Sequence, residues 1–209
     1  NLKNYYDKGV KAVAPDAYMI LEHWGGSMGT ERPQLISYGM QCWNNTSNAY
    51  CQTAMGWLKD GDGFGDASKD GYVSYCESHD EERMQYKCKK YGNGDLQTNT
   101  AARLARVAEN VAFNVLLNGS HMLWMWEEVG YDFSINSDLD HPNDYNESYR
   151  CSKKPRPEIR GYFTNANRVA AFTKCAQVIT LRTQLMPSVF EGNPSSVSVN
   201  SGSKLRKIQ

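Results

Sequence analysis

The sequence predicts an α/β fold built on a parallel sheet that is covered by helices on both faces. Two observations support this expectation: short apolar segments alternate with segments of helical periodicity, and each apolar segment is nearly continuous. Strands that are buried on both faces have continuous apolar sequences, whereas strands with one wet face alternate. In folds of this kind the reactive groups lie at the carboxyl ends of the strands.

The first half of the chain is expected to begin with a helix that ends at Pro15-Asp16. Its apolar face is formed by Leu2, Tyr6, Val10 and Val13. After it we expect strands over residues 17–21, 36–43 and 72–76, and a helix over 47–58. The Gly- and Asp-rich segment 59–71 separates that helix from the third strand.

The second half contains the clearest helical pattern, over about residues 100–117, and Asn118-Gly119 supplies its C-terminal cap. A strand over 121–126 follows. A last helix is expected to bury one apolar face, formed by Val169, Phe172, Ala176 and Ile179. From residue 189 on, short β-prone pieces with Gly, Asn and Pro turns indicate the start of another module.

Composition excludes several classes of partner. Lys+Arg and Asp+Glu both number 23, so no global field attracts nucleic acid or an anionic membrane. No apolar run approaches the ~20 residues of a membrane span. The chain opens on Asn1, without an initiator Met or a visible signal peptide, which indicates a processed or excised piece.

The six cysteines are scattered, without a Cys-x-x-Cys motif, and their spacing does not favour a zinc site. Cys76 and Cys175 lie inside apolar patterns and are expected to be buried thiols. Whether Cys42 and Cys51 pair across a loop is left open by their spacing.

Three of the four predicted strands end in polar, acidic residues. These ends are Glu22-His23, the run Glu-Ser-His-Asp at 77–80, and Glu127-Glu128. Because parallel strands bring their carboxyl ends to one edge of the sheet, we expect these groups to form a candidate site.

Three segments in this order resemble the later half of the α-amylase family of retaining glycoside hydrolases, family thirteen. They are "YMILEHW" at 18–24, "GYVSYCESHDEER" at 71–83 and "NGSHMLWMWEEVGYD" at 118–132. The resemblance covers nearly all of residues 1–190. It implies the C-terminal half of a (β/α)8 TIM barrel over residues 1–188, with strands five to eight, and the start of a C-terminal β-domain over 189–209.

The resemblance also implies roles for individual residues. Glu22 aligns with the general acid, Asp80 with the carboxylate that stabilises the transition state, and His79 with a substrate-binding histidine. The eighth-strand pattern aligns with Gly119, Glu128 and Gly130. The sequence departs from the family at Ser78, where Asn is usual, and at His121 and Trp126, where Pro and Gly are common.

The family's nucleophile, an Asp in a Gly-Phe-Arg-x-Asp-like motif on the fourth strand, has no counterpart here, and the third-strand motif is also missing. A (β/α)8 barrel needs about 250 residues. The implied partner is therefore the missing N-terminal half of the barrel, and the fragment alone is expected to be inactive.

Retaining glycosidases need two carboxyl groups about 5–5.5 Å apart. Glu22 suits the proton donor because a buried strand of Met19, Ile20 and Leu21 delivers it into a pocket, where burial favours the protonated carboxyl. Its alternative is a surface Glu at the start of a loop. For Asp80 and His79 the alternative is a pair that caps the next segment.

Other polar and aromatic residues near the strand ends have open or supporting roles. Trp24 either stacks on a sugar face or belongs to the core, and His23 is undecided. His121 is expected to be structural. Arg83, Glu77 and Glu128 are expected to support the site rather than react.

No cofactor is expected from this chain, although the resemblance allows calcium in the full-length protein. The loop at 60–71 fits an EF-hand at positions one, three and six, but Phe64 and Gly71 occupy positions five and twelve. A surface turn is therefore expected there. The acidic loop 137–144 offers equally little support for an ion.

The resemblance thus predicts hydrolysis of α-glucosidic bonds in starch or malto-oligosaccharides, and export to an extracellular or periplasmic location. α-Glucosidase or transglycosylase activity is a close alternative within the family. A non-catalytic barrel used for glucan binding or partnering is an alternative of another class. An unrelated β/α enzyme with coincident acids is a third alternative, and it predicts that Glu22 and Asp80 do not converge.

Overall fold

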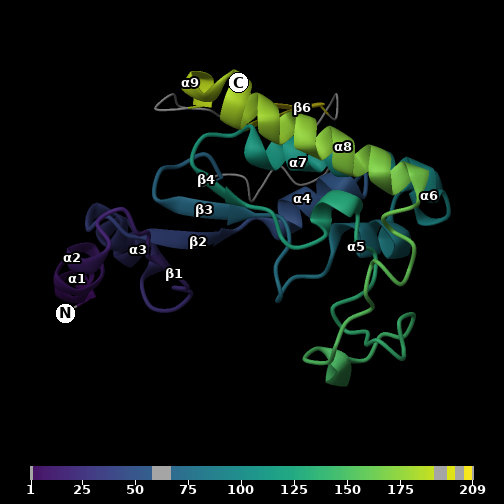
Figure 1. Ribbon diagram of the computed structural model, residues 1–209, viewed down its shortest axis with the longest axis horizontal. Coiled ribbons are helices and arrows are strands. Elements are labelled where there is room, and N and C mark those ends of the chain that lie inside the picture. The colour runs from purple at the N-terminus through teal and green to yellow at the C-terminus, as the bar shows by residue number, and fades with distance from the viewer. Residues whose placement is uncertain (1, 58–66, 191–196, 201–204, 209) are drawn as a thin grey trace.

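The computed structural model describes residues 2–57, 67–190, 197–200 and 205–208. Its centre is a parallel sheet with the strand order β1-β2-β3-β4 (Figure 1). The strands are β1 Ile20–Leu21, β2 Gln41–Asn45, β3 Tyr72–Tyr75 and β4 Ser120–Met122. The predicted parallel sheet is confirmed, and the first and last strands form its two edges. The half-barrel itself stays a prediction.

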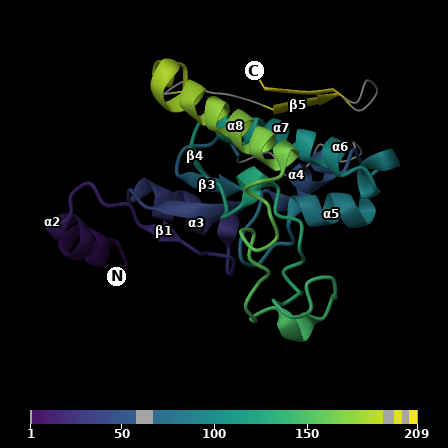
Figure 2. The ribbon, with the colours of Figure 1, turned by 45° about the vertical axis from the view of Figure 1, so that its right-hand side comes forward.

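The helices gather mainly on one side of this sheet. They are α1 Leu2–Tyr5, α2 Lys11–Val13, α3 Met28–Ser37, α4 Ser47–Ala54, α5 Met84–Tyr91, α6 Thr100–Ala105, α7 Val107–Val115, α8 Ala166–Thr180 and α9 Pro187–Phe190. Figure 2 shows α7 and α8 running side by side over the sheet, whereas α1 and α2 lie beyond its β1 end. The predicted cover on both faces is wrong for the described residues, because the other face borders an open cavity.

The register of the strands determines which residues share a face, because paired residues of a parallel sheet point the same way. Trp43 pairs with Val73, and Tyr75 pairs with both Asn45 and Met122, so these five residues lie on the cavity face.

The opposite face is buried under helices. There Asn44 Nδ2 donates to Ser74 Oγ at 2.9 Å, and Cys42 is fully buried. Because Leu21 pairs with Cys42, Leu21 lies on this helix-facing side. Ile20, the preceding residue, therefore points to the cavity face.

The main core lies between the sheet and the helices. One cluster joins α4 and α5 around Tyr50 and Cys76, and a second joins α7 and α8 around Val111 and Cys175. Cys76 and Cys175 are buried thiols, as predicted, and all six cysteines are free, including Cys42 and Cys51.

The predicted buried face of α8 is wrong. Val169 and Phe172 are 43% and 49% exposed, whereas Arg168, Ala171 and Cys175 are buried. Arg168 Nη1 donates to the carbonyl oxygen of Val129 at 2.8 Å. This contact holds a charged residue in the interior. The buried face of α8 is therefore formed by residues one position before those that hydrophobicity alone selects.

The predicted clear helix over residues 100–117 is divided at Arg106 into α6 and α7. The Arg106 guanidinium donates to the carbonyl oxygens of Ala54 and Thr53, both at 2.8 Å. The α4 helix is thereby joined to the break between α6 and α7.

Near the N-terminus, residues 2–13 are helical as predicted, with a π-helical stretch over Tyr6–Val10. Of the four residues on the expected apolar face only Tyr6 is buried, and its hydroxyl donates to the Gly39 carbonyl oxygen at 2.9 Å. The strand predicted over 36–43 is wrong in its first half, because residues 36 and 37 end α3.

Two further features follow the core elements. Val197–Asn200 (β5) and Leu205–Ile208 (β6) form an antiparallel pair in the segment where short β pieces are expected. Residues 60–66 of the predicted loop at 60–71 lie outside the described residues. No helix in the described ranges is long and apolar enough to cross a membrane.

Candidate functional site

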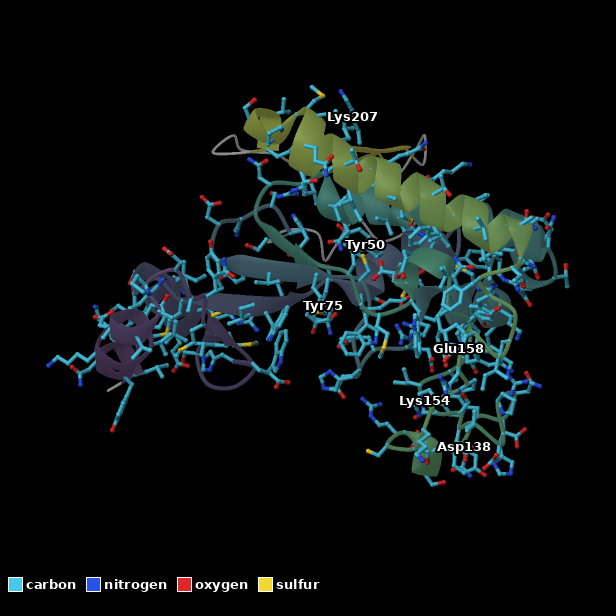
Figure 3. All side chains as sticks on the ribbon, viewed as in Figure 1. Tyr50, Tyr75, Asp138, Lys154, Glu158 and Lys207 are labelled. Atoms are coloured by element: carbon cyan, nitrogen blue, oxygen red, sulfur yellow. The ribbon has the colours of Figure 1, made fainter. Side chains whose placement is uncertain are left out.

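A cavity of about 360 Å³ opens at the carboxyl ends of the four parallel strands. Its lining comes from every strand end, namely Glu22, Trp24, Trp43, Asn45, Tyr75, Ser78, His79, Asp80, Glu81, Met122 and Trp124. Figure 3 shows Tyr75 on the side of the sheet away from Tyr50, which lies among the helices. The structure therefore brings together all four residues singled out from the sequence: Glu22, Trp24, His79 and Asp80. Their catalytic and binding roles stay predictions.

Glu22 follows the edge strand β1 directly. The expectation that a buried strand delivers it is wrong in the described chain, because Ile20 is 37% exposed and Glu22 is itself exposed. The physical reason is that β1 is two residues long and has a neighbour on one side only. Glu22 nevertheless reaches the same cavity as Asp80.

The segment that carries Glu22 is fixed by α3, a helix that the sequence reading missed. Arg32 Nε and Nη2 both donate to the His23 carbonyl oxygen, at 3.0 and 2.8 Å. The Arg32 guanidinium also lies 4.5 Å from the centre of a Trp24 ring. One buried arginine therefore holds the two residues that follow Glu22.

His23, undecided from the sequence, faces α3 and is absent from the lining of the cavity. Its Nε2 lies 2.7 Å from Glu31 Oε2. Gly26 has a φ of +63°, and an added Cβ there would meet the Glu31 carboxylate at 2.7 Å. The turn after β1 thus depends on glycine so that His23 and Glu31 can meet.

The end of β3 places His79 and Asp80 in the lining of the same cavity. His79 Nε2 lies 3.4 Å from Asp80 Oδ2, and the Asp80 backbone N–H donates to Ser78 Oγ at 3.0 Å. The Ser78 hydroxyl also donates to the Glu81 carboxylate, which accepts a second hydrogen bond from Asn45. The Ser78 hydroxyl therefore supplies a polar atom that shapes this turn.

Asp80 forms a further contact that no local sequence pattern indicates. Arg150 Nη2 lies 2.8 Å from Asp80 Oδ1. This hydrogen bond is the main reason that the pKa of Asp80 lies below its usual value, and the nearby His79 contributes to the same shift. Asp80 therefore lies in the cavity as a carboxylate.

Beneath the cavity two acids are buried. Glu77 Oε2 accepts from Arg83 Nη1 at 2.9 Å, and its Oε1 accepts from the Met84 backbone N–H at 2.8 Å. Glu127 Oε2 accepts from the Trp124 N–H at 3.2 Å, while its Oε1 has no hydrogen-bond partner among the described residues. Burial raises the pKa of both carboxyls, and the charge of Glu77 raises that of Glu127 further.

Glu77 and Arg83 therefore have the supporting position expected from the sequence. Arg83 also lies 5.9 Å from a Trp124 ring and 4.9 Å from the Tyr131 ring. Glu128 is absent from the lining of the cavity, and it borders a separate apolar hollow beside Val169 and Phe172.

Aromatic rings give the cavity its apolar walls. Trp43 meets Tyr75 edge to face at 5.8 Å, and Trp124 lies 6.1 Å from His79. Rings with exposed faces are the side chains on which sugars stack. Of the three tryptophans that line this cavity, Trp24, Trp43 and Trp124, only Trp24 was selected from the sequence. The place of Trp43 on the cavity face follows only from the strand register.

A second hollow, of about 290 Å³, adjoins the first and shares Ser78, His79 and Trp124 with it. Trp126 lines it and has a φ of +70°, in the left-handed region that non-glycine residues rarely adopt. Its ring lies 5.3 Å from Tyr131. Trp126 thus places an aromatic wall beside the cavity.

His121 has the structural position expected from the sequence. Its Nε2 lies 2.9 Å from the Leu117 carbonyl oxygen, and its Nδ1 lies 3.1 Å from Asn114 Oδ1. Burial, assisted by the charge of Arg182, lowers the pKa of His121 to about 4.

Metal binding gains no support from the described part of the chain, in which no group of three His, Cys, Asp or Glu side chains is arranged to hold an ion. Comparison with the models of known protein families gave no match for this sequence, and comparison with curated proteins gave no significant match.

Proposed function

We propose that this chain carries the general acid and the stabilising carboxylate of a retaining glycoside hydrolase that cleaves α-glucosidic bonds of starch or malto-oligosaccharides. One observation carries the proposal. Glu22 after β1 and Asp80 after β3 line one aromatic-walled cavity at the carboxyl ends of a parallel sheet. An unrelated fold with coincident acids gives no reason for this convergence.

In the proposed reaction Glu22 donates a proton to the leaving glycosidic oxygen and then accepts one from water. Asp80, held ionised by Arg150, stabilises positive charge that develops at the anomeric centre. Trp24, Trp43 and Trp124 offer ring faces to the sugar, and His79 offers a ring nitrogen to its hydroxyl groups.

The nucleophile is proposed to come from the other half of a (β/α)8 barrel. Support comes from the two open edges of the sheet and from the cavity face, which no described helix covers. In this proposal residues 1–188 are strands five to eight with their helices, and 189–209 begin a C-terminal β-domain. Export to an extracellular or periplasmic location and calcium in the full-length protein remain part of the proposal.

The decisive experiment is complementation. The upstream coding sequence is recovered, its product is mixed with this chain, and reducing sugar released from soluble starch is measured. We expect activity only in the mixture, and loss of activity when the Asp that ends the fourth strand is changed to Asn. If that Asp is absent and the mixture binds maltoheptaose without cleaving starch, the non-catalytic alternative replaces the proposal. Cleavage restricted to maltose, or transfer products, would identify the α-glucosidase or transglycosylase alternative.

A further inference from the structure

The contact between Arg150 and Asp80 joins two segments that are far apart in the sequence. Arg150 Nη2 donates to the Asp80 backbone carbonyl oxygen at 2.9 Å and to its side-chain Oδ1 at 2.8 Å. The same nitrogen thus contacts both the main chain and the carboxylate. A contact of this kind restrains the rotation of the Asp80 side chain and also stabilises its negative charge.

Arg150 lies in the long segment between β4 and α8, which Figure 1 shows extending away from the sheet. This segment is braced from within. Lys154 Nζ donates to the carbonyl oxygens of Ile135, Ser137 and Tyr149, at 2.6, 2.8 and 2.6 Å. Its Tyr149 contact fixes the residue next to Arg150.

The segment is also anchored to the residues that follow β3. Glu82 Oε1 accepts from the Ile135 backbone N–H, and Oε2 accepts from the Ser134 hydroxyl, both at 2.8 Å. Glu82 is two residues after Asp80, so both ends of the Arg150–Asp80 contact are tied to the same turn. Arg150 is therefore held in place by an ordered network.

Arg150 borders the second hollow, while Asp80 borders the first. With Oδ1 taken by Arg150, Oδ2 remains beside His79 in the cavity. A sugar in the first cavity would therefore meet one defined oxygen of Asp80.

We infer that Arg150 is a positioning residue for Asp80, which orients the carboxylate so that Oδ2 faces the substrate. The inference rests on the proposed function for its catalytic meaning, although the pairing itself can be measured without activity. Arg150 acts through Asp80 and takes no part in any bond-breaking step.

The other charged or titratable groups around Asp80 do not replace Arg150. They are His79, Glu81, Glu22 and Tyr75, which all line the same cavity. Glu22 and Glu81 are acids, and Glu81 already accepts hydrogen bonds from Asn45 and Ser78. The hydrogen bond from Arg150 has a larger effect on the pKa of Asp80 than any of these four neighbours.

The first test measures the pKa of Asp80 in the protein with the complete barrel by ¹³C-carboxyl NMR, assigned with Asp80→Asn. We expect Arg150→Gln to raise that pKa and Arg150→Lys to raise it less. Arg156→Gln is the matched control, because Arg156 lies in the same segment and pairs with exposed Glu158. An Asp80 pKa unchanged in Arg150→Gln would overturn the inference, whatever the chain catalyses.

The second test uses the protein with the complete barrel and starch as substrate. We expect Arg150→Gln to lower kcat about 10- to 100-fold with KM nearly unchanged, because a misplaced catalytic group costs rate rather than ground-state binding. Arg150→Lys should recover part of kcat, and Arg156→Gln should match the unmodified enzyme. A change confined to KM would overturn the inference. If no variant and no parent cleaves starch while the NMR shifts occur, the proposed function fails and the pairing stands.

Discussion

The Arg83 guanidinium lies 2.9 Å from the Glu77 carboxylate beneath the candidate site, and both side chains are buried, at 6% and 1% exposure. The pair joins the end of β3 to the start of α5, since Glu77 also accepts from the Met84 N–H. Arg83 extends the connection to the aromatic wall through Trp124 and Tyr131. The position of the cavity wall therefore depends on a charge pair in the interior.

Replacing Arg83 alone should destabilise the fold more than replacing both Arg83 and Glu77. Arg83→Met leaves the Glu77 carboxylate buried without its cation, and we expect the free energy of unfolding to fall by about 3–5 kcal/mol. The double variant Arg83→Met, Glu77→Gln should recover part of that loss. Urea unfolding at constant pH measures both, and additive losses would show that the two side chains are not coupled.

Glu127 makes stability depend on pH in a specific direction. Burial raises its pKa in the folded chain, so the protonated form is favoured there and stability falls as pH rises above the unfolded value of about 4.3. Glu127→Gln should therefore be close to neutral near pH 4 and increasingly stabilising towards pH 8. Urea unfolding at both pH values tests this. Glu128→Gln is the control, and an effect of Glu127→Gln that is equal at both pH values would contradict the prediction.

Arg32 should control the exposure of Trp24. Arg32→Met removes two hydrogen bonds to the His23 carbonyl oxygen and the contact with the Trp24 ring. We expect faster acrylamide quenching of tryptophan fluorescence and a loss of about 1–3 kcal/mol in stability. In a Trp24→Phe background the quenching difference should disappear. If the difference persists there, another tryptophan responds to the change.

Glu22→Gln in the full-length protein separates acid catalysis from binding. Gln keeps the shape but has no proton to donate, so starch hydrolysis should fall by about 10²- to 10⁴-fold. An aryl or fluoride glycoside, which needs little help in departure, should largely retain the first step, measured as a burst of the released group. Equal losses on both substrates would rule Glu22 out as the acid.

The chain alone should associate through its open strand edges. Ile20 lies on edge strand β1 and is 37% exposed, so Ile20→Lys should reduce association by placing a charge at that edge. Sedimentation velocity of the chain and of the variant measures the effect, with Val13→Lys as a control at an exposed helical site. Starch cleavage by a monomer of this chain would refute the half-barrel.

The sequence predicted the presence and order of the four parallel strands and the polar residues near their ends, because apolar runs and the residues after them are local signals. The bounds were less accurate: β1 and β4 are shorter than the expected 17–21 and 121–126, and β2 begins at Gln41 instead of residue 36. The prediction failed where arginines that bind the main chain decide the packing. Arg32 and Arg168 are buried and Arg106 is half-buried, and each donates to a main-chain carbonyl oxygen of another segment. A prediction from hydrophobic periodicity places arginine in the solvent. It therefore selected the wrong buried face for α8 and predicted α6 and α7 as one continuous helix.

The helices α3 and α5 were missed for a related reason. In α5 the buried positions include Gln85, and in α3 the buried residue is Arg32, so neither helix has a clear apolar stripe. The Arg150 contact depends on residues 70 positions apart in the chain and leaves no local pattern. The place of the cavity could thus be predicted from the strand ends, but the helices and arginine contacts that hold its walls could not.

The distribution of thiols provides a built-in attachment point for a reporter. Cys42, Cys51, Cys76, Cys88 and Cys175 are buried, and burial raises the pKa of each of these thiols, which slows their alkylation. Cys151 is exposed and follows Arg150 directly. A maleimide dye added to the native chain should therefore label one position, at the rim of the second hollow. Its emission can then test whether an added malto-oligosaccharide binds, without any change to the sequence.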